Sequence, residues 1–222
     1  MTLPETIPEE DFVERYLEPM SGTPRVIQIG ANEGRFEYAK VDGKDFLFDF
    51  LHTHPHWQAL LIEPIPPIFD RLRENYSGHP GIINFLNCAI TESVEQRALQ
   101  VSGKDGKSSR LVEGGAEDVS DTVLVQCLSY PIACRIMNWT SVDFVKIDAE
   151  GYDERIVHQI LDAKADIALP TTLMWEQIGP ERLKTTERVT AAGYHVMRTG
   201  LTKKGNNNYL DFVAVRRTAA ES

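Results

Sequence analysis

The chain has 222 residues and a mass of 25.0 kDa, and no Pro/Gly/Ser-rich linker separates two apolar halves, so we expect a single domain spanning residues 1–222. Hydrophobic residues make up 42% and charged residues 25%, which is typical of a globular protein and excludes an extended disordered chain. The net charge of −10 disfavours nucleic acid and anionic membranes as partners, because clustered Lys and Arg bind both. This charge is more compatible with a small-molecule substrate than with a polyanion.

The N-terminus has neither the basic start nor the apolar core of a signal peptide, and no run of eighteen apolar residues occurs. We therefore expect a cytoplasmic location. Cys88, Cys127 and Cys134 are an odd number without CxxC spacing, so we expect buried thiols rather than disulfides or zinc ligands.

Helical and strand-like segments alternate along the chain. An amphipathic helix is predicted over residues 8–19, within an N-terminal extension 1–24. Apolar runs predict seven strands, at 25–30, 59–64, 82–90, 142–151, 172–179, 194–198 and 209–217. Helical spacing predicts helices at 46–51, 66–76, 153–161 and 180–193. This alternation predicts an α/β layer fold with a mainly parallel sheet.

The last two strands break the pattern, because only "TGLTKKGNNN" separates them. Ten residues are too few for a crossover helix, so these strands should pair as an antiparallel hairpin.

The stretch "RVIQIGANEGRF" ends the first strand in a turn with Gly30 and Gly34 at its ends. Glycine permits unusual backbone angles and close approach of a ligand. Glu63 ends the next strand in "LLIEP", where a carboxylate can accept hydrogen bonds from ribose hydroxyls. Asn32 stands where a dinucleotide fingerprint has its middle glycine, so the pattern favours an adenosine ligand without a pyrophosphate.

The third strand ends in "NCAI", which is small or apolar. Cys88, Ala89 and Ile90 are therefore candidates for the adenine wall, although each alone is equally well a residue of the core.

Acidic side chains follow two later strands. Asp148 and Glu150 end the strand in "VKIDAEG", and Glu176 ends the one in "MWEQ". Carboxylates at such strand ends can act as a general base, orient an amine or hold a divalent metal. If they converge, their repulsion should raise at least one pKa. Asp153 and Glu154 are expected to be N-terminal charges of the following helix.

The motifs "VIQIGANEG", "LLIEPIPPIFDRLRENY", "FLNCAI" and "FVKIDAEGYDERIVHQIL", in this order, resemble those of the FkbM-type S-adenosylmethionine-dependent methyltransferases. The resemblance covers residues 26–178. It implies a Rossmann-like class I methyltransferase fold, a three-layer sandwich whose seven-stranded sheet has an antiparallel last strand. It also implies S-adenosylmethionine as cofactor and a hydroxyl oxygen of a small molecule or sugar as methyl acceptor.

The resemblance further implies how the cofactor is bound. Gly30, Asn32 and Gly34 would surround its methionine part, the Glu63–Pro64 pair would hold the ribose, and residues 88–90 would lie by the adenine. Gln28 stands where the family often has an acid that anchors the amino group, so this departure bears on cofactor affinity. Asp148 is the first candidate for the base or metal ligand, and Glu176 is the next candidate.

Two segments stay open at this stage. His52, His54 and His56 alternate in "HTHPHW", which suits a surface turn better than a metal site. Residues 101–121 lack apolar periodicity and form a candidate lid or substrate loop, or a mobile surface loop. Within that loop, Ser108, Ser109 and Arg110 are candidate contacts of the substrate or cofactor.

The function predicted from the sequence is therefore S-adenosylmethionine-dependent O-methylation. Two alternatives remain, a nucleoside-binding module without catalysis and, less favoured because of Asn32, a nicotinamide-dependent oxidoreductase.

Overall fold

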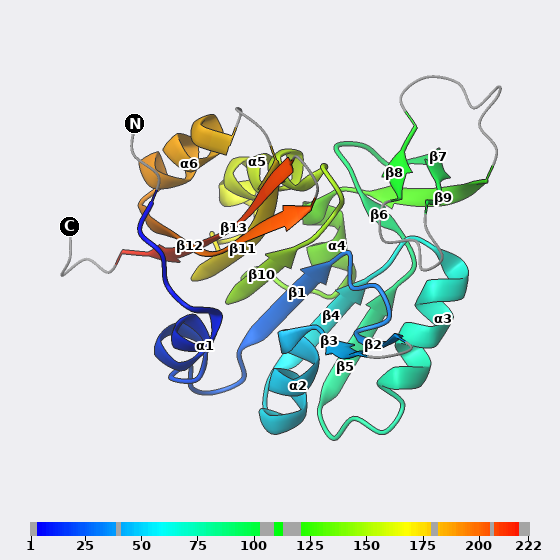
Figure 1. Cartoon of the computed structure of the whole chain (residues 1–222), viewed down its shortest axis with the longest axis horizontal. Coiled ribbons are helices and arrows are strands. Elements are labelled where there is room, and N and C mark those ends of the chain that lie inside the picture. The colour runs from blue at the N-terminus through cyan, green and yellow to red at the C-terminus, as the bar shows by residue number, and fades with distance from the viewer. Residues whose placement is uncertain are drawn as a thin grey trace.

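A computed structural model describes residues 4–38, 41–102, 109–112, 121–178, 182–204 and 207–217. Its centre is a seven-stranded sheet in the order β12-β13-β11-β10-β1-β4-β5 (Figure 1). The strands are β1 (Arg25–Ile29), β4 (Gln58–Ile62), β5 (Ile82–Leu86), β10 (Phe144–Ile147), β11 (Thr172–Ile178), β12 (Tyr194–Lys204) and β13 (Asn207–Arg216). Each of them overlaps one of the seven strands that the sequence predicts, with bounds that differ most at β5, β10 and β12.

The direction of the strands also agrees with the prediction. Strands β5, β4, β1, β10 and β11 pair in parallel, whereas β13 is antiparallel to both β11 and β12. The C-terminal hairpin is thus confirmed. The carboxyl ends of the five parallel strands consequently meet along one edge of the sheet.

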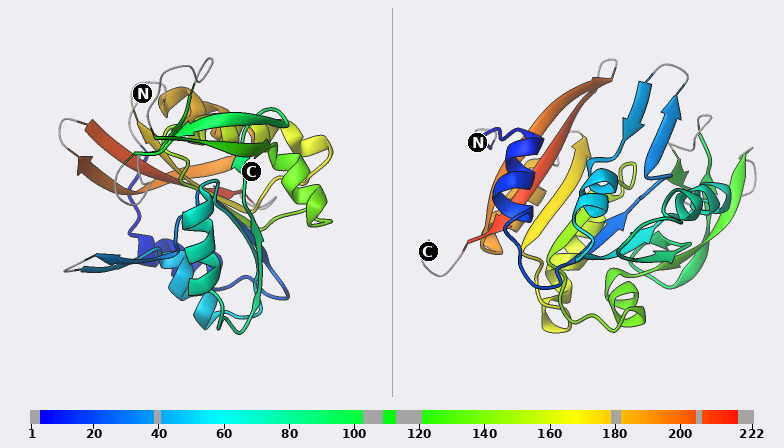
Figure 2. Two further views of the ribbon diagram at one scale, coloured as in Figure 1. Left: turned by 90° about the vertical axis from the view of Figure 1, so that its right-hand side faces the viewer. Right: turned by 90° about the horizontal axis from the view of Figure 1, so that it is seen from below.

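Helices cover both faces of the sheet, as two perpendicular views show (Figure 2). One face carries α1 (Glu9–Phe12), its π-helical continuation Val13–Leu17, α2 (Phe46–Thr53) and α3 (Pro66–Asn75). The other face carries α4 (Tyr130–Ile136), α5 (Asp153–Asp162) and α6 (Arg182–Ala191), with a 3-10 turn at Ala163–Ala165. The predicted helices are all present, with bounds that shift by a few residues.

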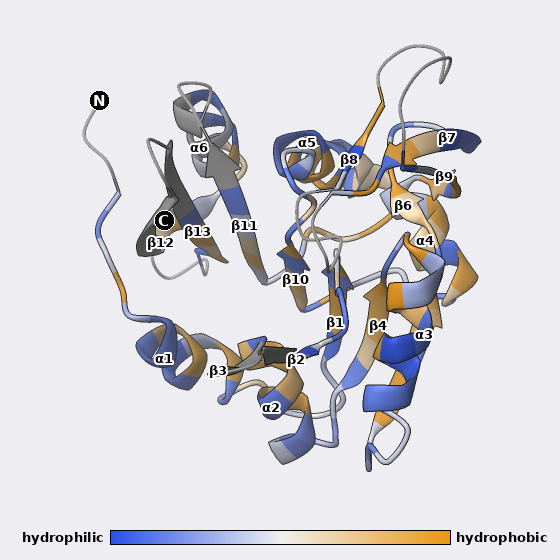
Figure 3. Ribbon diagram, turned by 45° about the vertical axis from the view of Figure 1, so that its right-hand side comes forward, coloured by the Kyte–Doolittle hydropathy of each residue, from blue (hydrophilic) through white to orange (hydrophobic). Residues whose placement is uncertain are grey.

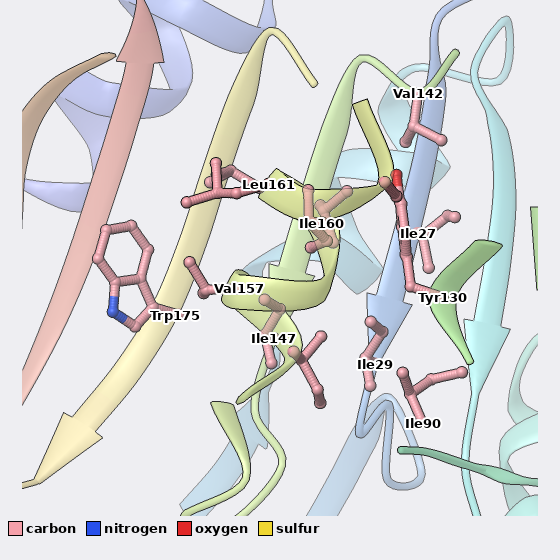
Figure 4. Close-up of a cluster of buried hydrophobic side chains, with 14 of the residues drawn as sticks. Ile27, Ile29, Ile90, Tyr130, Val142, Ile147, Val157, Ile160, Leu161 and Trp175 are labelled. Atoms are coloured by element: carbon pink, nitrogen blue, oxygen red, sulfur yellow. The ribbon is translucent and has the colours of Figure 1, made fainter. Parts of the chain in front are cut away.

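Two apolar cores separate these layers, because successive side chains of a strand point to opposite faces. In one core, Ile27 and Ile29 of β1 lie in the same apolar cluster as Val157 and Ile160 of α5 (Figure 4). Val26 of β1 packs in the other core with residues of α1 and α2. Polar and apolar stretches alternate around α3 and α5, as an amphipathic helix on a sheet requires (Figure 3).

A second sheet was not predicted. It consists of β6 (Ala89–Ile90), β9 (Thr122–Leu128), β7 (Glu95–Gln100) and β8 (Arg110–Leu111), in this order, and lies beyond the carboxyl ends of β4 and β5 (Figure 1). We call it the accessory sheet. Its inner side packs on α3, where Leu99, Val125 and Cys127 form a small core with Ile68.

The prediction of one strand over residues 82–90 was wrong, because the chain leaves the main sheet after Leu86. Asn87 donates hydrogen bonds from Nδ2 to the carbonyls of Glu63 (2.8 Å) and Pro64 (3.1 Å). This contact ties the break to the end of β4, and the chain then enters β6 of the accessory sheet.

Other features of the sequence find their place as well. The short hairpin β2 (Arg35–Tyr38) and β3 (Val41–Lys44) was not predicted. Of the candidate loop 101–121, residues 103–108 and 113–120, Ser108 included, lie outside the described residues. All three cysteines are free and buried, as expected. In the described part of the chain, none of the helices has the length and apolarity needed to cross a membrane.

Candidate active site

A cavity of about 760 Å³ lies beyond the carboxyl ends of the parallel strands. The ends of β1, β4, β10 and β11 form one side of it, which we call the strand-end wall, with residues Gly30, Asn32, Glu63, Asp148, Glu150 and Glu176. The accessory sheet forms the opposite side. The site therefore lies at the edge where ligands bind in open α/β sheets.

Gly30 shows why the turn after β1 is so tight. Its φ is +78°, and a Cβ atom built there would lie 1.9 Å from the carbonyl oxygen of Asp148. The backbone N–H groups of Gly30 and Ala31 donate to the Ile62 carbonyl at 3.0 and 2.9 Å. The turn is thus held between the ends of β10 and β4, and residue 30 has no room for a side chain.

Glu63 joins this turn to the end of β4. Its Oε2 accepts a hydrogen bond from the Asn32 backbone N–H (3.0 Å), and its Oε1 accepts one from the Ile65 N–H (2.9 Å). Burial raises the pKa of Glu63 to about 7, with a further contribution from the Asp148 charge. Each carboxylate oxygen accepts more than one hydrogen bond, so Glu63 can still receive ligand hydroxyls.

The third predicted segment lies beside Glu63. Cys88, Ala89 and Ile90 all line the cavity, together with Pro64 and Ser109. Burial raises the pKa of the Cys88 thiol to about 12, so this thiol is neutral at physiological pH. The Ser109 hydroxyl is buried and accepts a hydrogen bond from the Ser102 N–H (3.2 Å). Apart from that hydroxyl, this part of the wall is uncharged and mostly apolar, as a flat aromatic ring requires.

The three predicted acids are brought together. Asp148, Glu150 and Glu176 all line the cavity, and Asp148 Oδ2 lies 4.0 Å from Lys146 Nζ. Glu150 has a φ of +49°, a left-handed conformation that is uncommon for residues other than glycine. Within the described ranges, no group of three or more His, Cys, Asp or Glu residues could hold a metal ion.

Asp153 has the structural role that the sequence indicates. It begins α5, it is buried, and its carboxylate accepts hydrogen bonds from the N–H groups of Ala149 (3.2 Å) and Gly151 (3.2 Å). Burial and the nearby Asp148 charge raise its pKa to about 7. Asp153 thereby holds the backbone of the loop that carries Asp148 and Glu150.

Gln28 and Gly34 are not among the residues lining the cavity. Gln28 is buried on the α2 side of the sheet, where its Nε2 donates to Asp45 Oδ2 at 2.7 Å. Lys146 Nζ donates to the same oxygen at 2.8 Å. A Cβ atom at Gly34 would lie 2.8 Å from the Tyr76 ring, so packing against α3 explains this glycine.

Lys146 completes that buried group. Burial alone lowers the pKa of a lysine, but the carboxylates of Asp45 and Asp148 outweigh this effect and raise the pKa of Lys146 above its ordinary value. The ammonium group thus links the buried Asp45 to Asp148 in the cavity.

Sequence reasoning missed several residues on the opposite side. Arg97 of β7, Tyr152 at the N-cap of α5 and Arg155 within α5 line the cavity, as does Arg110, which the sequence did indicate. The sequence signal for Arg97 was weak, because "EQRALQ" is short and mostly polar. In the structure it forms a strand that places Arg97 and Leu99 on one face.

The alternating histidines belong to the end of α2. His52 Nδ1 lies 2.9 Å from the Phe48 carbonyl, and His54 stacks on Phe50 with ring centroids 4.2 Å apart. His56 is exposed. These contacts are those of a helix terminus and turn.

No protein-family model matches the chain, and no curated protein matches its sequence. Several solved structures match its fold. A METTL16 methyltransferase domain matches with a TM-score of 0.51 and 13% identity over 98% of this chain and 74% of its own. Magnesium protoporphyrin IX methyltransferase (ChlM) from Synechocystis PCC 6803, with bound S-adenosylmethionine, matches at 0.48 and 11% over 88% and 71%. TrmK of M. capricolum, in complex with S-adenosylhomocysteine, matches at 0.45 and 10% over 93% and 68%.

At these identities the likeness concerns the fold alone, and the METTL16 domain, with the TM-score above 0.5, is the match that supports it. The mostly parallel seven-stranded sheet with its antiparallel strand β13 is the arrangement that the family resemblance implies. The chain therefore has the Rossmann-like class I methyltransferase fold.

Proposed function

We propose that this protein is an S-adenosylmethionine-dependent methyltransferase of the FkbM type, which methylates a hydroxyl oxygen of a small molecule or sugar. The observation that carries the proposal is Glu63, a buried carboxylate bound to the backbone of the turn after β1 and adjacent to the uncharged segment 88–90. An acid in this place can bind both ribose hydroxyls while the neighbouring wall contacts the adenine. The fold supports the same assignment.

The residues around the cavity can divide the work as follows. Gly30 and Asn32 would lie against the methionine part, Glu63 and Pro64 would hold the ribose, and Cys88, Ala89, Ile90 and Ser109 would surround the adenine. When bound, S-adenosylmethionine supplies a methyl group already activated on a sulfonium. The protein then has to align the acceptor oxygen and remove its proton.

Asp148 is our candidate for the base. Its side chain lies in the cavity, about half exposed, and 4.0 Å from the ammonium of Lys146, which orients the carboxylate. Glu176 and Glu150 line the same cavity from β11 and the loop after β10, so either can contact the acceptor. A divalent metal bound by Asp148 and Glu176 would need ligands beyond these two side chains, such as water or the acceptor.

The net charge of −10 supports a small acceptor rather than a long polyanion. The cavity volume of about 760 Å³ falls in the upper part of the range of small-molecule sites. Both observations support an acceptor of limited size that binds next to the cofactor.

The test is methyl transfer from isotopically labelled S-adenosylmethionine into fractionated small-molecule extracts. We expect Asp148→Asn to lose turnover by at least about 100-fold, because a general base typically contributes that much, and to bind S-adenosylhomocysteine as the wild type does. Asp162→Asn is the matched control, since it removes the same charge from an exposed position on α5. Retained turnover in Asp148→Asn would refute the role of Asp148, and no transfer by the wild type into any fraction would refute the catalytic assignment.

A further inference from the structure

Three arginines converge on the cavity from separate elements, although the chain as a whole is acidic. Arg97 comes from β7, Arg110 from β8 and Arg155 from the first turn of α5. We call them the arginine cluster. They are the cations among the described residues that line the cavity, and four carboxylates, Glu63, Asp148, Glu150 and Glu176, line the strand-end wall. The cavity is therefore lined by charges of both signs.

Arg97 is a charged residue on the apolar face of the accessory sheet. It pairs across the sheet with Val125, which is buried, and the next inward residue on its own strand is the buried Leu99. Its Nη2 donates to the Val112 carbonyl at 3.3 Å. A guanidinium has five N–H donors in a planar fork, so Arg97 keeps donors available for a group in the cavity.

Arg155 is held in place by aromatic and acidic neighbours. Its guanidinium lies 5.0 Å from the centre of the Tyr152 ring, and its Nη1 lies 4.0 Å from Glu92 Oε1. The Tyr152 hydroxyl in turn donates to Glu92. Glu92 offsets part of the arginine charge, and the contacts restrict the positions that the half-exposed guanidinium can take. A guanidinium restricted in this way loses less side-chain entropy when it binds an anion.

Arg110 adds the third guanidinium from the edge of the accessory sheet. It pairs with Gln100 of β7, and its neighbour Leu111 pairs with Leu99. Arg110 is exposed, so its charge alone would attract an anion only weakly. Together with Arg97 and Arg155 it gives three guanidinium groups lining one cavity, and planar donor groups of this kind suit phosphate or carboxylate.

We infer that the arginine cluster binds an anionic group, phosphate or carboxylate, on the methyl acceptor. This inference rests on the proposed function, because it assigns the strand-end wall to the methyl donor. The donor's own amino-acid part is placed at the turn after β1, across the cavity from β7. The arginines are then free to select the acceptor, and a neutral sugar lacking such a group would be a poor substrate.

The experiment is calorimetric titration of protein saturated with S-adenosylhomocysteine, with inorganic phosphate, pyrophosphate and succinate as probes. We expect at least one probe to bind with one-to-one stoichiometry, and Arg97→Gln to weaken it at least about ten-fold, as the loss of a charge-assisted hydrogen bond does. Phosphate and succinate distinguish the two kinds of anion. Arg188→Gln, which removes an exposed arginine of α6 paired with Asp162 at the C-terminal end of α5, should leave the affinity unchanged.

Arg97→Lys guards against a variant that fails to fold, because it keeps the charge and loses only the fork. It should bind the probe with an affinity between those of the wild type and Arg97→Gln. Three results would overturn the inference: binding of none of the probes, equal binding by Arg97→Gln and wild type, or a cluster that serves the donor instead. The last would appear as weaker binding of S-adenosylhomocysteine by Arg97→Gln with unchanged binding of 5′-methylthioadenosine, which has no carboxylate.

Failure of the proposed function looks different. If S-adenosylhomocysteine does not bind, the donor assignment is wrong, and the same probes titrated into the protein alone still show whether the arginine cluster holds an anion.

Discussion

The two sides of the cavity are built differently. On the strand-end wall the polar groups bind one another: Glu63 accepts from the Asn32 and Ile65 backbone, and Gly30 touches the backbone of Asp148. On the accessory side, Arg97 and Arg110 line the cavity from β7 and β8, and Nη2 of Arg97 donates to the Val112 carbonyl rather than to the strand-end wall. The strand-end wall is therefore part of what stabilises the fold, whereas the arginine cluster can change with the substrate at little cost in stability.

The largest effect on stability should come from the lysine that lies under the strand-end wall. Lys146→Met leaves the buried Asp45 carboxylate without its cation, and we expect a loss of about 3–5 kcal/mol in the free energy of unfolding. Urea unfolding measures it. Lys164→Met, at an exposed position, should stay within about 0.5 kcal/mol of wild type. Equal stability of the two variants would show that the buried ion pair does not stabilise the fold.

A slightly smaller effect is expected at the turn itself. Gly30→Ala introduces a Cβ that would overlap the Asp148 carbonyl oxygen, at a residue with positive φ. We expect a loss of about 3 kcal/mol together with weakened binding of S-adenosylhomocysteine. Gly22→Ala separates the two causes, because Gly22 also has a positive φ but open space around it. It should lose only about 1 kcal/mol, and a loss as large as that of Gly30→Ala would contradict a role for the close contact.

An effect of similar size concerns Glu63 and pH. Its pKa in the folded protein is about 7, raised from 4.5, so the folded state holds this proton more tightly than the unfolded state. The stability that this group contributes is therefore present below about pH 4.5 and is lost as pH rises through about 7. Glu63→Gln removes the part of this dependence that Glu63 contributes and leaves the part due to Asp153, whose pKa is also raised to about 7. Urea unfolding at several pH values should therefore show a weaker dependence than in the wild type.

Ligand binding should depend on pH in the opposite direction. Ribose hydroxyls donate to the ionised carboxylate, so S-adenosylhomocysteine should bind about ten-fold more weakly at about pH 6 than at about pH 8. Glu63→Gln should bind weakly at both values. An affinity of the wild type that does not change between these values would indicate that Glu63 does not hold the ribose.

The sequence predicts the main sheet well because its strands carry strong local signals. Runs such as "RVIQI" and "FVKI" are buried on both faces, so most of their residues are apolar. Acids that follow such runs must appear at the same edge of a parallel sheet, which is why Asp148, Glu150 and Glu176 could be placed in one cavity before the fold was known.

The accessory sheet could not be predicted in the same way. Its strand β6 has two residues, β8 has two, and Leu124 of β9 is exposed, so neither length nor alternation marks them. Arg97 was missed for that reason, whereas Arg155 lies in the predicted helix 153–161, whose periodicity does not show that this side chain lines the cavity. Gln28 shows the other limit, because the sequence cannot tell that its side chain turns toward Asp45 on the opposite face of β1.

Calorimetric titration with S-adenosylhomocysteine, and separately with NAD, each with and without magnesium, tests the central claim most directly. We predict one-to-one binding of S-adenosylhomocysteine, no binding of NAD, and a clear loss of affinity in Glu63→Gln. A magnesium effect would identify the cavity acids as metal ligands. Binding of NAD alone, or of neither ligand, would contradict the assignment of this cavity to a methyl donor.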